Sequence, residues 1–180
     1  MLVGGMLAMA GGAYQGVFRN PLADPYLLGA AAGAGLGATL VITSSPVRTL
    51  GPVGVVPIAA FVGALTGVGL AYLIGSAANR TGAGGATLLL AGVAVASFLT
   101  AVQTVVQQAN TESLREVYGW ILGQLGAATW TSIGLMVPYA VGSVAVLAFA
   151  GRPLDLLAVG DEEAHTLGVN PKRVRFVVLA

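Results

Sequence analysis

The sequence predicts an all-α protein, a bundle of helices that cross a membrane several times. Hydrophobic residues make up 56% of the 180 residues and charged residues only 8%, whereas an ordinary soluble domain carries about 25% charged residues. The mean hydropathy is +0.86. The few charges gather in short segments between long apolar runs, which is the pattern of a polytopic membrane protein.

Five apolar runs approach the length of about 20 residues that a helix needs to cross the hydrocarbon core of a bilayer. In chain order they are 1–18, 27–42, 53–74, 87–106 and 132–150, and the second is short. A sixth begins at Val174 and continues to the last residue. The first run has no basic segment ahead of it, so we expect a membrane helix there and not a signal peptide.

Polar segments rich in glycine and proline separate these runs. They are RNPLADP (19–25), TSSPVRTLGP (43–52), SAANRTGAGGA (76–86) and a long segment from Gly151 to Arg173. The segment from Thr111 to about Gly126 carries acidic and basic residues together with Trp120. Because Trp and Tyr favour the membrane–water boundary, we expect a short helix lying at the surface there.

The basic residues predict the orientation of the helices. If successive runs alternate in direction, one face of the membrane holds six of the eight basic residues: Arg19, Arg80, Arg152, Lys172, Arg173 and Arg175. The opposite face holds Arg48 and Arg115. By the positive-inside rule, the face with six basic residues is cytoplasmic.

Small residues recur at intervals of four within three of the runs. Such spacing places them on one helix face, where they allow two backbones to approach closely in lipid. The predicted packing faces are Ala8–Gly12–Gly16, Gly29–Gly33–Gly37 and Gly63–Gly67.

The sequence offers no groups for catalysis or for binding a metal or cofactor. None of the seven acidic residues and no basic residue lies inside a predicted spanning run, and the only histidine, His165, is in the last long segment. Cysteine is absent. There is no phosphate-binding G-x-x-x-x-G-K-[ST] motif and no basic tract for nucleic acid. We therefore expect no enzyme activity, no cofactor and no nucleotide site in this chain.

One polar stripe runs along the fourth apolar run. Ser97, Thr100, Thr104 and Gln107 are spaced by three, four and three residues, so they share a helix face, with Gln103 and Gln108 beside them. Uncharged hydroxyls and amides could line a passage for a polar solute. They could equally form hydrogen bonds between helices.

The long segment after residue 150 predicts two short helices. Pro153 suits the first turn of one helix and Gly160 its end, and Asp161 would cap a second that Gly168 closes. Asn170 and Pro171 fit the N-cap and first position of the next spanning helix. The segment is either a docking surface or a plain amphipathic connector. The apolar residues that we expect to be partly exposed on it are Leu154, Leu157, Ala164 and Leu167.

Three segments are similar to those of a known family. The stretch YQGVFRNPLADPYLLGAAAGAGLGA resembles the signature of FecCD-type permeases, the membrane subunits of ABC importers for iron–siderophore complexes, haem, vitamin B12 and related cargo. LLLAGVAVASF resembles the start of that family's fifth helix. LDLLAVGDEEAHTLGVNPKRVR resembles its coupling segment. The resemblance extends over essentially the whole chain, with the segments in the same order.

The resemblance implies an incomplete type II ABC importer permease-like fold. The chain would be a single transmembrane domain fragment over 1–180, from the family's second helix to the start of its seventh, with a cytoplasmic coupling segment at 151–170. It would form the translocation pathway for an iron–siderophore, haem, cobalamin or similar cargo by alternating access. The implied location is the inner membrane of a prokaryotic cell.

The resemblance also implies partners. These are a second permease subunit, identical or paired, ATP-binding cassette subunits that hydrolyse ATP, an extracytoplasmic substrate-binding protein and the lipid bilayer, with no nucleic acid. An ion-coupled secondary transporter or channel subunit is the alternative function, and it would need an ionisable residue in mid-membrane.

Four groups of site residues follow from the resemblance. The ATPase subunits would dock on Leu154, Leu157, Ala158, Gly160, Asp161, Glu162, Ala164, Leu167 and Gly168. The translocation pathway would be lined by Ser97, Thr100, Thr104 and Gln107. The loop before the fourth run would provide an inner gate at Gly85 and Ala86. The signature turn on the cytoplasmic side would be Arg19, Asn20, Pro21, Leu22, Ala23, Asp24 and Pro25.

Overall fold

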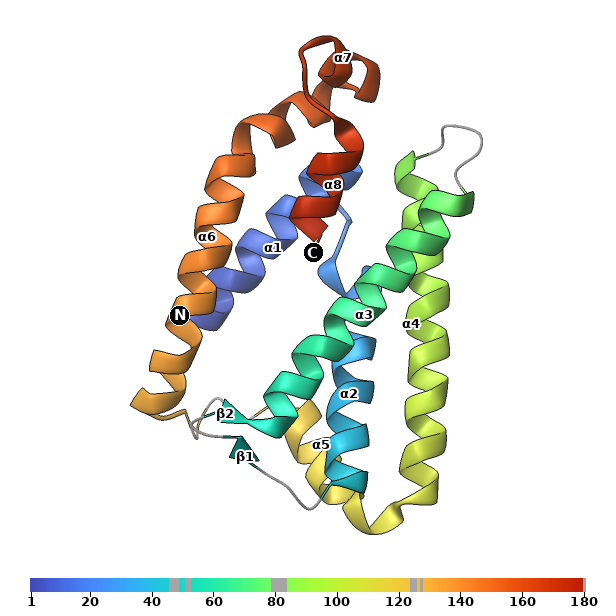
Figure 1. Ribbon diagram of the computed structural model, residues 1–180, viewed down its shortest axis with the longest axis vertical. Coiled ribbons are helices and arrows are strands. Elements are labelled where there is room, and N and C mark those ends of the chain that lie inside the picture. The colour runs from blue at the N-terminus through green and yellow to red at the C-terminus, as the bar shows by residue number, and fades with distance from the viewer. Residues whose placement is uncertain (46–48, 51–52, 79–83, 124–125, 127, 180) are drawn as a thin grey trace. The chain divides into compact units, whose positions relative to one another are not determined.

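The computed structural model describes residues 1–45, 49–50, 53–78, 84–123, 126 and 128–179. The chain forms two compact units: unit 1 consists of Met1–Pro25 and Trp130–Ala180, and unit 2 of Tyr26–Thr129. Nearly all described elements of both units are helices (Figure 1). The predicted all-α bundle is therefore confirmed.

Unit 2 is built around three helices, α2 (Ala30–Ser44), α3 (Val55–Ala78) and α4 (Gly84–Ala109). Each of them packs against the other two (Figure 1). Its shorter elements are the 3-10 helices η1 (Pro25–Leu28) and η2 (Thr111–Ser113), the antiparallel strands β1 (Thr49–Leu50) and β2 (Val53–Gly54), and helix α5 (Leu114–Ile121). The small strand pair was not predicted.

Helix α5 is shorter than the predicted surface helix. It ends at Ile121, not near Gly126, because Gly123 adopts a left-handed conformation with φ 74°. The N–H of Gly123 there donates to the carbonyl of Trp120 at 3.1 Å and closes the last turn. A helix commonly ends in this way on a glycine.

Glycines bring α2 and α3 into backbone contact, as predicted. A Cβ placed on Gly33 would lie 2.8 Å from the carbonyl carbon of Gly63. One on Gly37 would lie 2.9 Å from the carbonyl carbon of Ala59, and one on Gly67 would lie 3.1 Å from that of Gly29. Side chains larger than hydrogen are therefore excluded at these three glycines, and such small residues are what allows two membrane helices to pack closely.

Unit 1 contains α1 (Leu2–Phe18), α6 (Trp130–Val159), α7 (Asp161–Thr166) and α8 (Pro171–Leu179). Helix α1 packs against α6 and α8. The predicted packing face Ala8–Gly12–Gly16 is wrong for this unit. No described atom lies within 4 Å of a Cβ placed on Gly12, and one on Gly16 meets only the Leu154 side chain, at 3.7 Å. Helix α1 instead buries Ala13, Tyr14, Val17 and Phe18.

Helix α6 continues through the position where a new helix was predicted. It runs for 30 residues to Val159 and holds both Pro138 and Pro153 in its interior. Proline removes one backbone hydrogen bond and bends a helix without necessarily ending it. Figure 1 shows the last turns of α6 bending away from the axis of the rest of the helix. The expected helix break at Pro153 is therefore a bend.

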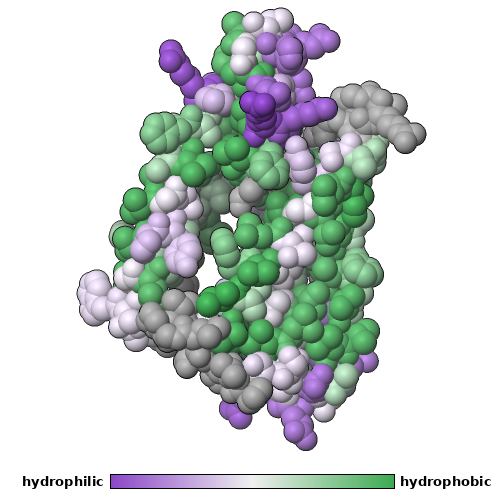
Figure 2. Space-filling model, in the orientation of Figure 1, coloured by the Kyte–Doolittle hydropathy of each residue, from purple (hydrophilic) through white to green (hydrophobic). Residues whose placement is uncertain are grey.

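Among the described residues, three helices are long and apolar enough to cross a membrane: Val55–Ala78, Gly85–Ala109 and Trp130–Val159. Helices α1 and α2 are apolar but shorter, with 17 and 15 residues. Apolar residues cover α3 and α4 in the space-filling view, and hydrophilic residues gather around α7 (Figure 2). The three long helices expose large apolar side chains, for example Phe61 on α3, Phe98 on α4 and Phe149 on α6. This surface suits a lipid environment.

Candidate functional site

Helix α7 is a short helix held between two glycines. Gly160 is its N-cap residue, and Asp161 is its first helical residue, so the predicted cap at Asp161 is wrong. Gly168 follows it with φ 83°. There the N–H groups of Gly168 and Val169 donate to the carbonyls of His165 and Ala164, at 3.1 and 2.9 Å. A left-handed glycine of this kind satisfies the last carbonyls of a helix.

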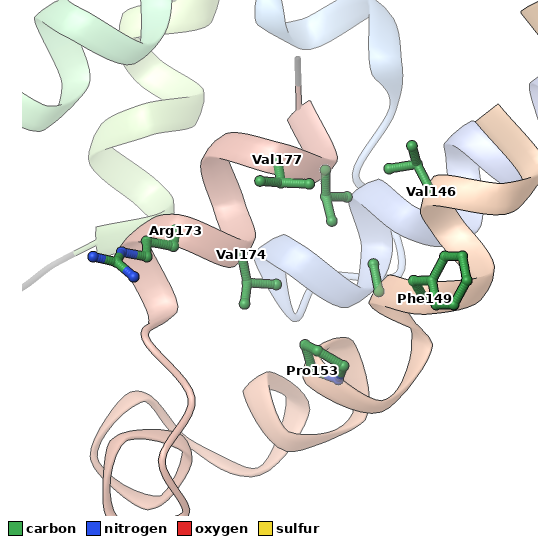
Figure 3. A pocket seen from close by; sticks show the side chains of 8 residues that line it. Val146, Phe149, Pro153, Arg173, Val174 and Val177 are labelled. Carbon is green, nitrogen blue, oxygen red and sulfur yellow. The ribbon is translucent and has the colours of Figure 1, made fainter. Parts of the chain in front are cut away.

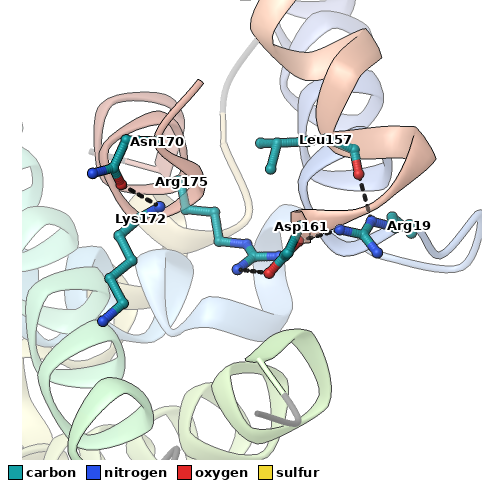
Figure 4. Close-up of polar contacts among 6 residues, drawn as sticks. All are labelled: Arg19, Leu157, Asp161, Asn170, Lys172 and Arg175. Carbon is teal, nitrogen blue, oxygen red and sulfur yellow. Dashed lines mark hydrogen bonds and ion pairs between the residues drawn. The ribbon is translucent and has the colours of Figure 1, made fainter. Parts of the chain in front are cut away.

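The start of α8 is as predicted. The side-chain oxygen of Asn170 accepts a hydrogen bond from the N–H of Lys172 at 3.1 Å (Figure 4). It accepts another from the N–H of Arg173 at 3.3 Å. Pro171, which has no N–H to satisfy, is the first residue of the helix. Gly168, Asn170 and Pro171 together turn the chain from α7 into α8.

The Asp161 carboxylate lies between two arginines (Figure 4). Both terminal nitrogens of Arg175 donate to it, at 2.9 and 2.8 Å. Arg19 at the end of α1 forms an ion pair with the same carboxylate, and its Nε donates to the carbonyl of Leu157 at 2.5 Å. These contacts join the signature turn to the coupling segment within unit 1. The residues are 142 positions apart in the sequence.

The predicted exposure of the coupling segment is only partly correct. Leu157 and Ala164 are fully buried and Gly160 is buried, so these three residues belong to the core and present no surface to a partner. Helix α6 continues to Val159, and this continuation turns Leu157 inward. Leu154 is half-buried against Gly16. Of the predicted docking residues, the exposed ones are Ala158, Glu162, Leu167 and Gly168, and Leu167 is 64% exposed.

The signature turn is built from local hydrogen bonds. Arg19 adopts a left-handed conformation, φ 50°, which ends α1 and lets the N–H of Asn20 donate to the carbonyl of Gln15 at 3.2 Å. The Asn20 side chain in turn accepts from the N–H of Leu22 at 2.9 Å. Ala23 is buried and Leu22 is exposed. Pro21, Asp24 and Pro25 complete the turn, and Pro25 begins η1.

The polar stripe on α4 is mainly exposed. Ser97, Thr100 and Thr104 are exposed and Gln107 is buried. The hydroxyls of Ser97 and Thr104 donate to carbonyls of their own helix, at 2.9 Å in both cases. The hydrogen bond between helices comes from Gln103 instead, which was expected only to flank the stripe.

Gln103 lies in a buried polar cluster that sequence reasoning missed. Its Nε2 donates to the hydroxyl of Thr39 at 3.2 Å, and that hydroxyl donates to the carbonyl of Gly35 at 2.7 Å. Thr39 is fully buried. A Cβ on Gly35 would lie 2.9 Å from the Gln103 side-chain oxygen, so a larger residue at this position would displace the end of the Gln103 side chain. The cluster links α2 to α4 within unit 2.

Gly85 and Ala86 lie in the first turn of α4, not in the loop before it. The predicted loop position is therefore wrong, because the helix begins at Gly84, earlier than the apolar run indicates. Residues 79–83 of that loop, among them Arg80, are outside the described residues, as is Arg48.

Unit 1 has an apolar cavity of about 360 Å³ between α6 and α8. Val146, Phe149 and Pro153 line it from α6, Val174 and Val177 from α8, and Arg173 lies at its edge (Figure 3). No sequence pattern indicated it. In the part of the chain that the structure describes, no group of three acidic or histidine side chains could hold a metal ion.

Comparison with known proteins places these features in context. The model of the FecCD transport family matches residues 1–180. The chain is 39% identical to the cobalamin import system permease protein BtuC of Halobacterium salinarum over 179 residues, which are 99% of this chain and 47% of that protein. It is 36% identical to the hemin transport system permease protein HmuU of Yersinia pestis, covering 99% of this chain and 53% of that protein.

A solved structure shares the fold. It is an inward-facing conformation of an ABC transporter described as of the metal-chelate type, with a TM-score of 0.82 and 25% sequence identity. The match covers 99% of this chain and 55% of the other. The chain thus spans about half the length of the curated relatives it matches.

Proposed function

This chain belongs to the FecCD transport family, and on that premise we propose that it is part of the permease subunit of an ATP-binding cassette importer. Its helices form one transmembrane domain segment and contribute to the translocation pathway, which works by alternating access. The chain itself is not an enzyme, because ATP is hydrolysed by separate subunits.

One observation carries this proposal: α7 offers a compact, exposed apolar contact at the basic end of unit 1. Leu167 is 64% exposed just after α7, with Glu162 and Gly168 exposed nearby. Arg19 at the end of α1 and Arg175 in α8 bind Asp161 of α7, and Lys172 and Arg173 lie in the first turn of α8. Basic residues favour the cytoplasmic side, where ATPase subunits bind.

The partners follow from the same proposal. They are a second permease subunit, two ATP-binding cassette subunits that dock on the exposed part of the segment 154–168, and an extracytoplasmic substrate-binding protein. The bilayer is the inner membrane of a prokaryotic cell. The relatives named above support a cargo of the iron–siderophore, haem or cobalamin kind.

We assign the exposed side of α4 to the passage. Ser97, Thr100 and Thr104 present uncharged polar groups there, and their exposure favours a passage lining over hydrogen bonding between helices. Gly85 and Ala86, in the first turn of the same helix, are proposed to take part in the inner gate.

Replacing Leu167 with aspartate is expected to uncouple ATP hydrolysis from uptake. The change puts a charge on an apolar docking contact, and the loss of a hot-spot contact costs about 2 kcal/mol or more of binding. In proteoliposomes containing the assembled transporter, ATP-driven uptake should fall by about tenfold or more, since about 1.4 kcal/mol corresponds to a factor of ten. The fold should persist because the side chain is mainly exposed.

The control is Leu22→Asp, the same change at an apolar side chain that is 83% exposed in the signature turn. It should leave uptake near the wild-type level. Normal ATP-driven uptake by the Leu167→Asp transporter would refute the docking site. Uptake by the wild type that needs an ion gradient and ignores ATP would instead favour the secondary transporter.

A further inference from the structure

Three segments of unit 1 meet at a single carboxylate. Asp161, the first residue of α7, binds Arg19 at the end of α1 and Arg175 in α8. Arg19 also donates to the carbonyl of Leu157 in the last turns of α6. Arg19 therefore bridges both sides of Gly160, the residue at which α6 ends and α7 begins (Figure 4).

The pairing with Arg175 is stronger than an ordinary surface ion pair. It is bidentate, with nitrogen–oxygen distances of 2.9 and 2.8 Å, and the Arg175 side chain is only 13% exposed. Its Nε is buried and finds no acceptor among the described residues. The negative charge of Asp161 thus compensates the positive charge of the largely buried Arg175 guanidinium. Removal of the Asp161 carboxylate would leave that positive charge poorly solvated.

Helix α7 depends on these contacts for its position. It has six residues, and Ala164 is the one buried residue within it. A helix this short is not stable by itself in water, because too few hydrogen bonds offset the cost of nucleation. What holds α7 in place is therefore the burial of Ala164, the turn at Gly168 and the ion pairs of Asp161.

We propose that Arg19, Asp161 and Arg175 form a clamp that fixes α7 to the end of α1 and to α8, so that Asp161 is a positioning residue for coupling. Because its carboxylate is engaged by the two arginines, we withdraw Asp161 from the predicted docking residues and assign it no contact with the ATPase subunits. It transmits the movement that they impose on α7 to α1 and α8. This inference rests on the proposed function in one respect: the ATPase subunits are the source of the movement. The contacts of the clamp itself lie within unit 1 and do not depend on that function.

The clamp can be tested with two single variants and their combination. Asp161→Asn keeps the shape but removes the charge, and Arg175→Gln removes the bidentate partner. Arg173→Gln is the matched control, because it removes a charge from the same helix at an exposed side chain. In the assembled transporter, hydrogen exchange of the amides of residues 161–168 reports how firmly α7 is held.

Both single variants should speed exchange of these amides by about threefold to tenfold, the range for a charge-assisted bond that is partly exposed to solvent. They should lower the cargo imported per ATP hydrolysed by a similar factor. The double variant should be no worse than the worse single variant, because both changes break the same interaction. Asp161→Glu keeps the charge, so it should import more cargo per ATP hydrolysed than Asp161→Asn does. ATPase association should stay at the wild-type level throughout.

Two results would overturn the clamp. One is unchanged exchange of α7 in both single variants. The other is loss of ATPase association in Asp161→Asn together with normal behaviour of Arg175→Gln, which would make Asp161 a direct contact. A wild-type transporter that shows no ATP-driven uptake would refute the proposed function instead, and the exchange results would still decide whether the clamp exists.

Discussion

Replacing Gly63 with alanine is expected to destabilise unit 2 by about 3 kcal/mol or more, at or above the upper end of the usual cost of overpacking. The added Cβ would lie 2.9 Å from the carbonyl carbon of Gly33 and 3.3 Å from the Cα of Gly37. Both atoms belong to the backbone of α2, so no side-chain rotation can relieve the overlap. The two helices would have to separate, and they would then lose van der Waals contact along their whole interface.

The melting temperature of the assembled transporter in detergent measures this effect. Gly69→Ala is the matched control on the same helix, because no described atom lies within 4 Å of its Cβ position. It should leave the melting temperature unchanged or raise it slightly, since alanine is the better helix former. Equal melting temperatures for the two variants would contradict the close contact between α2 and α3.

Replacing Leu157 with alanine is expected to lower the stability of the protein by about 2–5 kcal/mol, the range for removing a buried leucine side chain. Leu157 is fully buried in α6, close to the junction with α7. The cavity would weaken the region on which the Arg19 contacts depend. Thermal unfolding in detergent is again the measurement.

The same substitution at Leu167 provides the control, because that side chain is 64% exposed. Leu167→Ala should change stability by less than about 0.5 kcal/mol, as is usual for surface positions. A second control, Leu157→Met, nearly conserves volume and should cost less than about 1.5 kcal/mol. If Leu157→Ala proved as stable as Leu167→Ala, the burial of Leu157 would be wrong and it could belong to the docking surface after all.

The features predicted correctly from the sequence depend on local chemistry. Apolar runs locate the membrane helices because the bilayer sets their length and composition. The start of α8 was predicted because Asn170 and Pro171 satisfy the first turn through their own groups. The close contact of α2 with α3 follows from glycines at intervals of four on both helices, since in lipid such small faces favour close packing of two backbones.

The features missed depend on packing between distant segments. Pro153 indicated a new helix, but a bend costs less than a break when the following turn buries Leu157. An amphipathic pattern does not say which leucines face the core, so Leu157 and Leu167 were treated alike. The ion pair of Arg19 with Asp161 joins residues 142 positions apart. It also needs Arg19 in a left-handed conformation, which is uncommon for a residue other than glycine.

The central claim is that α7 and its flanks are the cytoplasmic docking site of an ATPase subunit. The chain has no cysteine, and His165 is exposed on α7, so His165→Cys introduces a single thiol at this surface. The measurement is labelling of that thiol by a membrane-impermeant reagent in inside-out vesicles, with and without the ATPase subunit. We expect rapid labelling that the bound ATPase subunit suppresses. Labelling at the same rate with the ATPase subunit present would contradict the claim and favour an ion-coupled carrier.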